Sequence, residues 1–457
     1  MRIEEKETKT GGRTRMDGKH GKYMVVLYTK PADCGGNCLY CIRATEVTRS
    51  TVPNEDTLLA KACGWSAGAQ MLQRCEDSGI VLHTGNKFEL RIKGNSFTNY
   101  DMAYLEGFIK EIYDLLNGFV GETFADSFRA QETAKDKCVQ IVVETRPDQI
   151  THAWCRQMLE WGVRTVELGV QSLSDDVLAR NHRGHDTACV RKATKMIRQY
   201  GFELGYQVML GLYGSSDALD REMLCSGLWT REYYPDSLKV YPCLLLPDEE
   251  AQKPLYALFH SGDWSPLQDE AYHRFLQEVL PHIPEDVHVN RLQRIFTAQE
   301  IAHGVKECID RGKYSGICRS MWQRSIQNTS KLYLAHDDYR LISFFHDGEL
   351  CVQAVLEDQT ILGYGRLRLC DEFALIRDLR VLGTPLRVGQ KPNAPDELQH
   401  RGIGRNMLCY MERYAAQQGK RRVLVHASAG CVGYFKKNGY CADNDYTLRK
   451  ECNPATP

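Results

Sequence analysis

The sequence lacks any long apolar run. No stretch of its 457 residues approaches the roughly 20 apolar residues that a membrane-spanning helix needs, so no membrane contact is expected. The first 22 residues, MRIEEKETKTGGRTRMDGKHGK, carry charges where a secretion signal needs an apolar stretch. We therefore expect a cytoplasmic chain.

A strong excess of one charge is also absent. The formal net charge is −1, so no protein-wide basic field marks the chain as a nucleic-acid binder, and any polyanion site must be a local patch. Hydrophobic residues make up 43% and charged residues 26%, which is typical of globular proteins. At 457 residues the chain is too long for one ordinary core, and two or three domains are expected.

Cysteine, by contrast, is plentiful. The 18 cysteines are scattered through a long chain without an export signal. Most should therefore be free thiols, and a tight cluster is a metal candidate. The stretch DCGGNCLYC (33–41) is such a cluster: it holds Cys34, Cys38 and Cys41 with C-x3-C-x2-C spacing, after the apolar strand expected at 24–30.

Three cysteines are one ligand short of a closed zinc site. Structural zinc needs a fourth ligand nearby, and the nearest upstream histidine is His20. Three thiolates can instead bind three irons of a [4Fe–4S] cluster and leave the fourth iron open to another ligand. Three free thiols, or a zinc site with a distant fourth ligand, are the alternatives.

Strand-like and helix-like segments alternate after the cysteines. Apolar stretches predict strands at 88–94, 139–147, 163–172, 203–212 and 236–245, and amphipathic stretches predict helices at 103–119 and 188–201. Alternating βα units indicate a parallel sheet. With about six units, a partial barrel is the natural closure.

Polar residues collect where these strands end, which is where βα barrels place their sites. The segment ETRPD (144–148) begins with Glu144, and ELGVQS (167–172) contains Gln171. Lys239 lies inside an apolar strand, where a lysine is unfavourable unless it is paired. We interpret Lys239 as a ligand contact rather than as part of the core. For ETRPD, a strand that simply ends at Pro147 is an equal alternative.

The C-terminal part has a different pattern. A strand is predicted at 371–383, a helix at 405–419, a strand at 421–427 and a helix at 431–440. Between the first two lies QHRGIG (399–404), in which Gln399-x-x-Gly402-x-Gly404 opens the helix. Glycines let backbone N–H groups approach phosphates, and a helix N-terminus favours anions. The pattern suggests a diphosphate-binding loop, although a plain turn is the alternative.

These motifs carry a family resemblance. The cysteine spacing, with Tyr40 before the last cysteine, resembles the radical S-adenosylmethionine (SAM) superfamily. Followed in order by ETRPD, ELGVQS, NHRGHD (181–186) and LKVYP (238–242), it resembles the catalytic subunit of elongator and its standalone relatives. That family joins a radical SAM domain to a GCN5-related N-acetyltransferase (GNAT) domain. The implied division is a basic arm at 1–22, a radical SAM domain of partial parallel βα (TIM-like) barrel form at 23–300, a linker at 301–335 and a GNAT domain at 336–457.

The resemblance implies a function. Such proteins modify C5 of the wobble uridine of transfer RNA by carboxymethylation, using acetyl-CoA and a 5′-deoxyadenosyl radical made from SAM at a [4Fe–4S] cluster. The tRNA anticodon loop is the implied partner, together with elongator-type protein subunits. Two other functions remain as hypotheses: a GNAT-type protein lysine acetyltransferase with a structural radical SAM domain, and a non-catalytic tRNA-binding subunit.

Site residues follow from the resemblance, position by position. The cluster ligands are Cys34, Cys38 and Cys41. The acetyl-CoA loop comprises Gln399, His400, Arg401, Gly402, Ile403 and Gly404. Tyr434 is the acetyl-site tyrosine and, with Lys239, a candidate catalytic residue. Further cofactor contacts are expected at Lys30, Gly94, Ser96, Glu144 and Gln171, and RNA contacts at Arg13, Arg15, Lys19, Arg291 and Arg294. His400 and His426 are candidate acid/base groups, with a solvent-facing histidine as the equal alternative.

The sequence departs from the family at two places. A Gly-Gly-Thr-like motif that holds the SAM amino group is expected after the second strand, but KGNSF (93–97) keeps only Gly94, with Ser96 able to make one hydrogen bond. Many relatives also carry Cys-x-Cys-x-x-Cys in the linker. Here only Cys318 remains, with Ser320 and Gln323 at the other positions. One thiol cannot build a structural zinc site, so none is predicted, and packing through Trp322 is expected to hold the linker.

Overall fold

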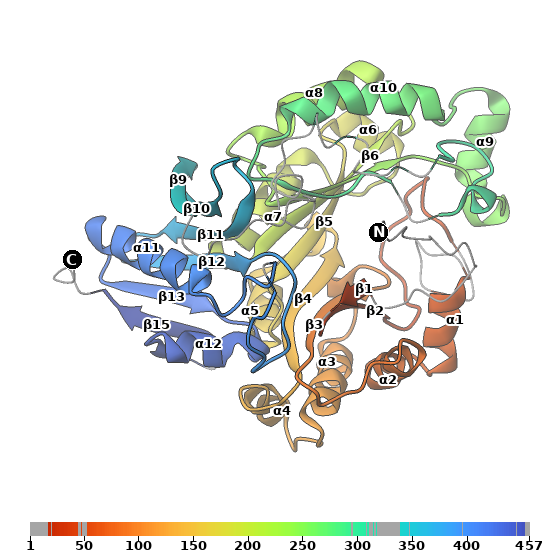
Figure 1. Ribbon diagram of the computed structural model, residues 1–457. Helices are drawn as coiled ribbons and strands as arrows, with labels where there is room; N and C mark the ends of the chain where they lie inside the picture. The colour runs from red at the N-terminus through yellow and green to blue at the C-terminus, as the bar shows by residue number, and fades with distance from the viewer. Residues whose placement is uncertain are drawn as a thin grey trace, which may run out of the picture.

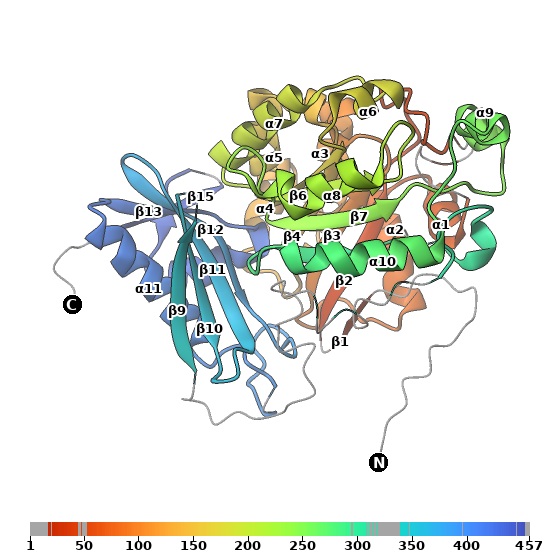
Figure 2. The same cartoon turned by 90° about the horizontal axis from the view of Figure 1, so that it is seen from above.

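The structure is a computed structural model that describes residues 17–19, 21–43, 47, 53–293, 296–307, 309, 314, 317, 339–346, 348–394, 396–444 and 446–452. Two separate β-sheets organise these residues (Figures 1 and 2). Within these ranges, every helix is too short or too polar to traverse a lipid bilayer. Several predicted positions lie outside the described residues: Arg13, Arg15, Arg294, Cys318, Ser320, Trp322 and Gln323.

The first sheet is a half-barrel whose strands follow chain order. Its strands are β1 (Asp17–Lys19), β2 (Lys22–Tyr28), β3 (Lys87–Lys93), β4 (Lys137–Thr145), β5 (Thr165–Gln171), β6 (Glu203–Leu210), β7 (Ser237–Pro242) and β8 (His288–Arg291). Strands β2 to β8 pair in parallel, and β1 pairs antiparallel with β2. This confirms the predicted partial parallel barrel. The short strands β1 and β8 were not predicted from the sequence.

Helices connect these strands and pack on the outside of the half-barrel (Figure 1). They are α1 (Glu55–Ala62), α2 (Ala67–Asp77), α3 (Met102–Asn117), α4 (Phe124–Ala130), α5 (His152–Glu160), α6 (Asp175–Arg180), α7 (Thr187–Gln199), α8 (Asp217–Cys225), α9 (Lys253–Ser261) and α10 (Asp269–Val279). Local sequence explains the bounds of α3: Asp101 accepts hydrogen bonds from the first-turn N–H groups, and Gly118 ends the helix in the left-handed conformation.

Strand β3 shows why the barrel interior is polar. Its apolar residues Phe88, Leu90 and Ile92 are buried in the core shared with the helices. The residues between them, Glu89, Arg91 and Lys93, project from the opposite face, because side chains alternate along a strand. Glu89 and Arg91 form an ion pair of 3.1 Å on that face. The alternation therefore places charge inside the half-barrel and apolar packing outside it.

The second sheet is mostly antiparallel and has the order β14-β15-β13-β12-β11-β10-β9. Its strands are β9 (Arg340–His346), β10 (Glu349–Val355), β11 (Ile361–Leu369), β12 (Phe373–Val381), β13 (Arg422–His426), β14 (Cys441–Ala442) and β15 (Thr447–Glu451), and its helices are α11 (Ile403–Gln417) and α12 (Val432–Lys437). The strands and helices predicted between 371 and 440 all occur, although α12 stops before Asn438 and Gly439, where the backbone leaves the helical conformation.

Strands β12 and β13 are the parallel pair of this sheet, and they separate part of the way along. Their pairing runs from Phe373 opposite Arg422 to Ile376 opposite Val425. Beyond Ile376, β12 continues and pairs only with β11. The buried face of α11 packs on this sheet through the residues Met407, Leu408, Met411 and Ala415.

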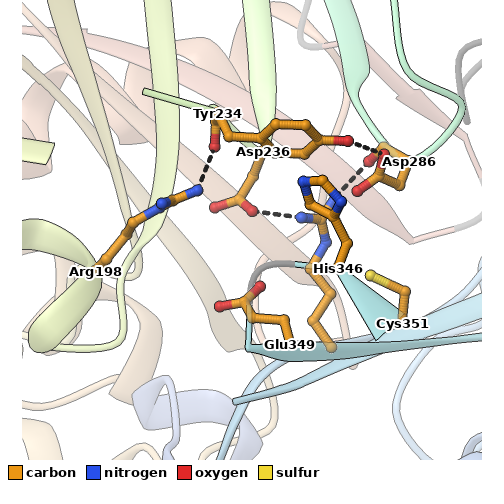
Figure 3. A pocket seen from close by; sticks show the side chains of 8 residues that line it. Arg198, Tyr234, Asp236, Asp286, His346, Glu349 and Cys351 are labelled. Atoms are coloured by element: carbon orange, nitrogen blue, oxygen red, sulfur yellow. Dashed lines mark hydrogen bonds and ion pairs between the residues drawn. The ribbon is translucent and has the colours of Figure 1, made fainter. Parts of the chain in front are cut away.

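Buried ion pairs join the two sheets. Arg366 of β11 and Arg377 of β12 converge on Asp236, which immediately precedes β7. Arg377 also pairs with Glu349 of β10. Figure 3 shows the small polar pocket at this junction, where the ring of His346 lies 4.1 Å from that of Tyr234, centroid to centroid. Because its charged groups satisfy one another, we interpret the pocket as part of the domain contact.

Candidate active site

The three cysteines lie on the loop that leaves the C-terminal end of β2, and Cys38 is the buried member. Gly35 has a φ of +66°, a conformation that side chains rarely adopt. A Cβ on Gly36 would collide with the guanidinium of Arg146 and lie 3.4 Å from the Cys34 sulfur. These glycines let the loop wrap closely against the end of β4.

Two arginines approach the Cys38 sulfur: Arg146, which directly follows β4, and Arg183, which lies between α6 and α7. Arg183 Nη1 lies 3.4 Å and Arg146 Nη1 3.9 Å from Sγ. Arg183 is fixed by donating to the Gly169 carbonyl at 2.6 Å, and Arg146 by an ion pair with Asp148 at 2.9 Å. Burial alone would raise the pKa of the Cys38 thiol, but Arg183 and Arg146 outweigh it and hold the pKa below its ordinary value.

This donor set fits an iron–sulfur cluster. Within the described ranges, no three His, Cys, Asp or Glu side chains are grouped closely enough to hold a single metal ion. In a [4Fe–4S] cluster each thiolate binds a different iron, so the sulfurs are spaced more widely than the ligands of one ion. A glycine-lined loop with flanking cations suits an anionic thiolate cluster, and Cys34, Cys38 and Cys41 are the residues that would hold it.

The turn after β3 lies against the cysteine loop. Gly94 has a φ of +149°, and a Cβ there would collide with the Thr29 hydroxyl. The Ser96 hydroxyl is buried and lies 2.9 Å from that of Thr145. Gln149 also contacts Ser96, and it donates to the Cys34 carbonyl at 3.2 Å. The KGNSF segment therefore supports the cysteine loop through the contact of Ser96 with Gln149.

Lys239 crosses the barrel interior and is paired, as its burial requires. Its ammonium lies 2.9 Å from Glu144 Oε1 and also contacts Glu167. Arg91 pairs with the other oxygen of Glu167 at 3.2 Å. Burial lowers the pKa of the Lys239 ammonium, but the two carboxylates outweigh it and raise the pKa overall. Lys239 thus fixes the carboxylate of Glu144, whose side chain keeps 33% exposure at the end of β4.

Three further predicted residues lie around this end of the barrel. Gln171 ends β5, is buried and has a φ of +71°. Arg291 ends β8 and is partly exposed. Lys30 is exposed beside the cysteine loop, with its ammonium 4.4 Å from the centre of the Tyr104 ring. The structure brings Lys30, Glu144, Gln171 and Arg291 to the same end of the sheet as the cysteines. Lys19 lies in β1, at the barrel edge, and its side chain is not described.

The predicted diphosphate loop forms a tight turn before α11. His400 and Gly402 have φ values of +63° and +89°. Gly402 is the N-cap residue, and no side chain of the described residues caps the helix. Its first N–H groups are therefore available to an anion. The turn fits a coenzyme A diphosphate. Tyr434 of α12 stands beside it, with its hydroxyl 3.1 Å from the position of a Cβ on Gly404.

Three residues that were predicted to act at the acetyl-CoA site, Arg401, Gln399 and His426, form hydrogen bonds within the protein. Arg401 turns back to donate to the Glu397 and Ala394 carbonyls, at 2.6 Å each, so it stabilises the preceding loop. Gln399 accepts a hydrogen bond from Lys87 of the barrel at 2.8 Å. His426 lies 2.9 Å from the Thr447 hydroxyl, and burial lowers its pKa to about 3, which keeps the ring neutral.

The two candidate cofactor sites lie at opposite ends of the barrel. The second sheet contacts the N-terminal ends of the strands, near Lys87 and Asp236, while the cysteine loop leaves the C-terminal end of β2 (Figures 1 and 2). At about 3.3 Å per residue, a strand of β3's length separates the ends by about 20 Å. The charged interior of β3, with Arg91 and Glu89, spans this distance.

Sequence reasoning missed two residues of the cysteine site. Arg146 belongs to the polar residues expected at the end of a strand and Arg183 stands in NHRGHD, but neither was predicted to contact the cysteines. A buried thiolate predicts nearby cations, yet the sequence separation of 145 residues between Cys38 and Arg183 hides the contact.

Comparisons with known proteins agree with this architecture. Residues 97–223 match the Radical SAM superfamily, and residues 318–440 match the Acetyltransferase (GNAT) family. A Dehalococcoides mccartyi "tRNA uridine(34) acetyltransferase" is 30% identical over 445 residues, which cover 91% of this chain and 95% of that protein. Human "Elongator complex protein 3" is 25% identical, over 94% of this chain and 84% of that protein.

A solved structure extends the likeness to the whole fold. The archaeal Methanocaldococcus infernus Elp3 with an N-terminal deletion superposes with a TM-score of 0.79 at 26% identity, covering 94% of this chain and 99% of that chain. The likeness to these relatives thus extends over both the radical SAM and the GNAT part of this chain. The chain belongs to the family of the tRNA uridine(34) acetyltransferases and elongator complex protein 3.

Proposed function

We propose that this protein modifies C5 of the wobble uridine of transfer RNA, with acetyl-CoA as the source of the added carbon unit and SAM as the source of the radical. The observation that carries the proposal is the combination, in one chain, of a cysteine loop buttressed by Arg183 and Arg146 with an uncapped diphosphate turn before α11. The names of the relatives, tRNA uridine(34) acetyltransferase among them, support tRNA as the substrate.

The chemistry explains why two sites are needed. Joining an acetyl methyl carbon to uracil C5 removes one hydrogen from each carbon and is a net two-electron oxidation, so acid–base catalysis alone is insufficient. When bound, a [4Fe–4S] cluster with SAM supplies the 5′-deoxyadenosyl radical chemistry that can take hydrogen from such a methyl group. The carbon unit would then join C5, the C5 hydrogen would leave as a proton, and one electron would return to the reductant that began the reaction. Hydrolysis of the thioester would release coenzyme A and leave a carboxymethyl group.

The chain's own residues position and shield these reactants. Cys34, Cys38 and Cys41 would hold the cluster, and Arg183 supplies positive charge at Cys38. Gly94 lets the turn after β3 pack on Thr29, because a side chain there would collide with the Thr29 hydroxyl, and this holds the turn beside the expected SAM site. Lys239 fixes Glu144, so that the carboxylate presents acceptor atoms in one orientation at the barrel mouth.

The acetyl-CoA end has its own division of roles. The N–H groups at the start of α11 would bind the diphosphate. Tyr434, whose hydroxyl group has a pKa raised to about 12 by burial, stays protonated and can donate a hydrogen bond to a thioester or a leaving thiolate. Its side chain is 41% exposed, so a ligand can reach it.

The RNA would enter at the cysteine end. A wobble base belongs to a single-stranded loop and can be turned out of its stack into a barrel mouth. Lys30 and Arg291 are two described basic residues at that end that can meet phosphates, as a local patch on a nearly neutral protein requires. The predicted contacts at Arg13, Arg15, Lys19 and Arg294 belong to the same proposal.

Two other functions lead to different observations. A protein lysine acetyltransferase would use acetyl-CoA without SAM, and the cysteine loop would have no role in its reaction. A non-catalytic tRNA-binding subunit would hold neither cofactor productively. The contacts of Arg183 and Arg146 with Cys38 favour the radical enzyme, because a scaffold has no need of cations at a buried thiol.

The test is anaerobic. The protein is reconstituted with iron and sulfide, reduced with dithionite and given SAM, and 5′-deoxyadenosine is measured with and without tRNA and acetyl-CoA. We expect product from wild type and from Cys75→Ala, a buried cysteine of α2, and none from Cys38→Ala. A cluster without product in the wild type would contradict radical chemistry. tRNA-independent acetyl-CoA hydrolysis would then favour the acetyltransferase alternative.

A further inference from the structure

A lysine of the barrel lies on the diphosphate turn of the other domain. Lys87, the first residue of β3, donates from Nζ to Gln399 Oε1 at 2.8 Å. The same oxygen accepts from the Leu386 backbone at 3.2 Å. Two residues before Lys87, the Gly85 carbonyl accepts from the Val388 backbone at 2.8 Å. The start of β3 is therefore held directly against the segments that form the turn.

The charge of Lys87 is uncompensated. Among the described residues, no carboxylate lies within ion-pair distance, and its hydrogen-bond partner is a neutral amide. Burial lowers the pKa of the Lys87 ammonium; Cys431 opposes this shift, and Lys22, the partner of Lys87 in strand register, adds to it. Lys87 is half-buried, and a cation that is partly removed from water is stabilised by an anionic partner. Lys87 lacks one at the point where an anionic cofactor is expected.

Other cations gather at the same turn. The pKa of His400 is lowered by burial and by the positive charges of Lys87 and Lys437. Lys437 is the last residue of α12, the helix that carries Tyr434. The turn is thus approached by positive charge from the barrel on one side and from α12 on the other.

Neighbouring contacts between the domains differ from the Lys87–Gln399 contact because they are ion pairs. Lys436 of α12 pairs with Glu132 at 2.6 Å, and Arg380 of β12 pairs with Glu203 at 2.6 Å. In both, a carboxylate across the interface neutralises the cation. If Lys87 served only to join the domains, a carboxylate at position 399 would do so better than the amide present. A carboxylate there would also repel a diphosphate, whereas an amide does not.

We infer that Lys87 is a coenzyme A ligand contributed by the radical SAM domain, and that its ammonium binds the diphosphate at the turn formed by residues 399–404. The inference rests on the proposed use of acetyl-CoA and adds a contact from outside the GNAT domain. Its consequence is that the cofactor bridges the two domains, so that the barrel takes part in holding acetyl-CoA about 20 Å from the cysteine loop.

The test measures binding of coenzyme A and of 3′-dephospho-coenzyme A to the full chain by calorimetry. A charge-assisted hydrogen bond at this position corresponds to roughly tenfold to a hundredfold in affinity. We expect Lys87→Met to weaken both ligands by that factor and Lys87→Arg to restore most of the affinity. Lys420→Met, which removes a lysine that donates to the Asp371 carbonyl, is the matched control and should bind like wild type.

The two ligands separate the outcomes. Weakening of coenzyme A alone would assign Lys87 to the 3′-phosphate and overturn the diphosphate contact. Equal affinity of wild type and Lys87→Met for both ligands would overturn the inference while leaving the proposed function intact. A wild-type chain that binds neither ligand would overturn the inference together with the acetyl-CoA part of the proposed function.

Thermal unfolding without ligand separates binding from a purely structural role. Removing a half-buried cation that has no carboxylate partner should leave the midpoint of apo Lys87→Met unchanged or raise it. The increase in midpoint that coenzyme A causes in wild type should shrink in the variant, because stabilisation by a ligand follows its affinity. If apo Lys87→Met had a lower midpoint than wild type, and coenzyme A raised that midpoint as much as it does in wild type, Lys87 would be a structural contact. This result would contradict the inference.

Discussion

Arg183 Nη1 lies 3.4 Å from Cys38 Sγ, although the two residues are 145 positions apart in the sequence. This contact gives the candidate cluster a fixed positive neighbour, because the same guanidinium is held by the Gly169 carbonyl. Positive charge beside a cluster stabilises its reduced, more negative form. The arginine should therefore affect how easily the cluster accepts an electron.

We predict that Arg183→Met makes a reconstituted cluster harder to reduce. All three cysteines remain, so the iron content should stay near that of wild type. A redox titration followed by electron paramagnetic resonance should place the reduction potential of the variant below that of wild type. Arg183→Lys keeps a positive charge and should lie between the two. Equal potentials in all three proteins would show that this charge does not tune the cluster.

A second prediction concerns the buried ion pairs of Lys239. Glu167 is 2% exposed and depends on Lys239 and Arg91 for neutralisation. Lys239→Met should lower the free energy of unfolding by about 3 kcal/mol, because it leaves a buried carboxylate short of one partner. Urea denaturation measures this loss. Adding Glu167→Gln to the variant should restore part of the stability.

The control for this prediction is an exposed ion pair. Lys253 and Glu250 have side chains 72% and 80% exposed, so Lys253→Met should leave the free energy of unfolding almost unchanged. If Lys239→Met proved as stable as wild type, the ion pairs of Lys239 with Glu144 and Glu167 would contribute nothing to the stability of the barrel. The proposed role of Lys239 in orienting Glu144 would then lose its basis.

The strands were predictable because local patterns determine them. The alternation of Phe88, Leu90 and Ile92 with charged residues requires a two-faced strand, and Gly402 marks the turn before α11. Contacts between distant segments were not predictable. The sequence indicated that Lys239 needs partners, but its partners Glu144 and Glu167 lie 95 and 72 residues away and meet it only because the sheet curves.

The orientation of individual side chains was equally hidden. Arg401 was expected to contact acetyl-CoA, yet its guanidinium donates to carbonyls of its own loop. A sequence pattern places the residue at the turn but not its long side chain, which has several staggered conformations. The placement of the second domain at the N-terminal end of the barrel depends on Asp236, a residue outside every motif that carried the resemblance.

That aspartate yields a third prediction. Burial alone would raise the pKa of Asp236, but Arg377 and Arg366 outweigh it and hold the pKa well below its usual range. Asp236→Asn leaves two buried guanidinium groups without this counter-charge, which should cost about 3–5 kcal/mol. Because the lost contacts join the two sheets, differential scanning calorimetry should show the transition shift downward and broaden or split.

Asp371→Asn provides the comparison for Asp236→Asn. Asp371 is exposed before β12, and its side chain should matter little to the domain contact. If Asp236→Asn unfolded with the same calorimetric transition as wild type, the apolar part of the interface would be sufficient to hold the two domains together. A downward shift without loss of secondary structure would identify Asp236 as a specific link between the domains.

The last prediction concerns pH and Lys93, the final residue of β3. Burial lowers the pKa of its ammonium to about 8, with Glu144 opposing the effect and Arg291 adding to it. In the unfolded chain a lysine has a pKa near 10.4. Between about pH 8 and pH 10.4 the unfolded chain therefore binds more protons at this residue than the folded chain does. Stability due to Lys93 must rise with pH across that window.

The expected result follows from this sign. Below pH 8 the folded protein carries a charged Lys93 at a cost on the order of 2 kcal/mol, allowing for its partial exposure. Lys93→Met should therefore be more stable than wild type at pH 7, and the difference should shrink as pH rises to 10. Urea denaturation at several pH values measures it. Lys192→Met, which removes an exposed lysine of α7, should show no such trend. If the difference in free energy of unfolding between wild type and Lys93→Met did not change with pH, Lys93 would stay protonated over the whole range. The barrel would then hold no neutral lysine beside Glu144.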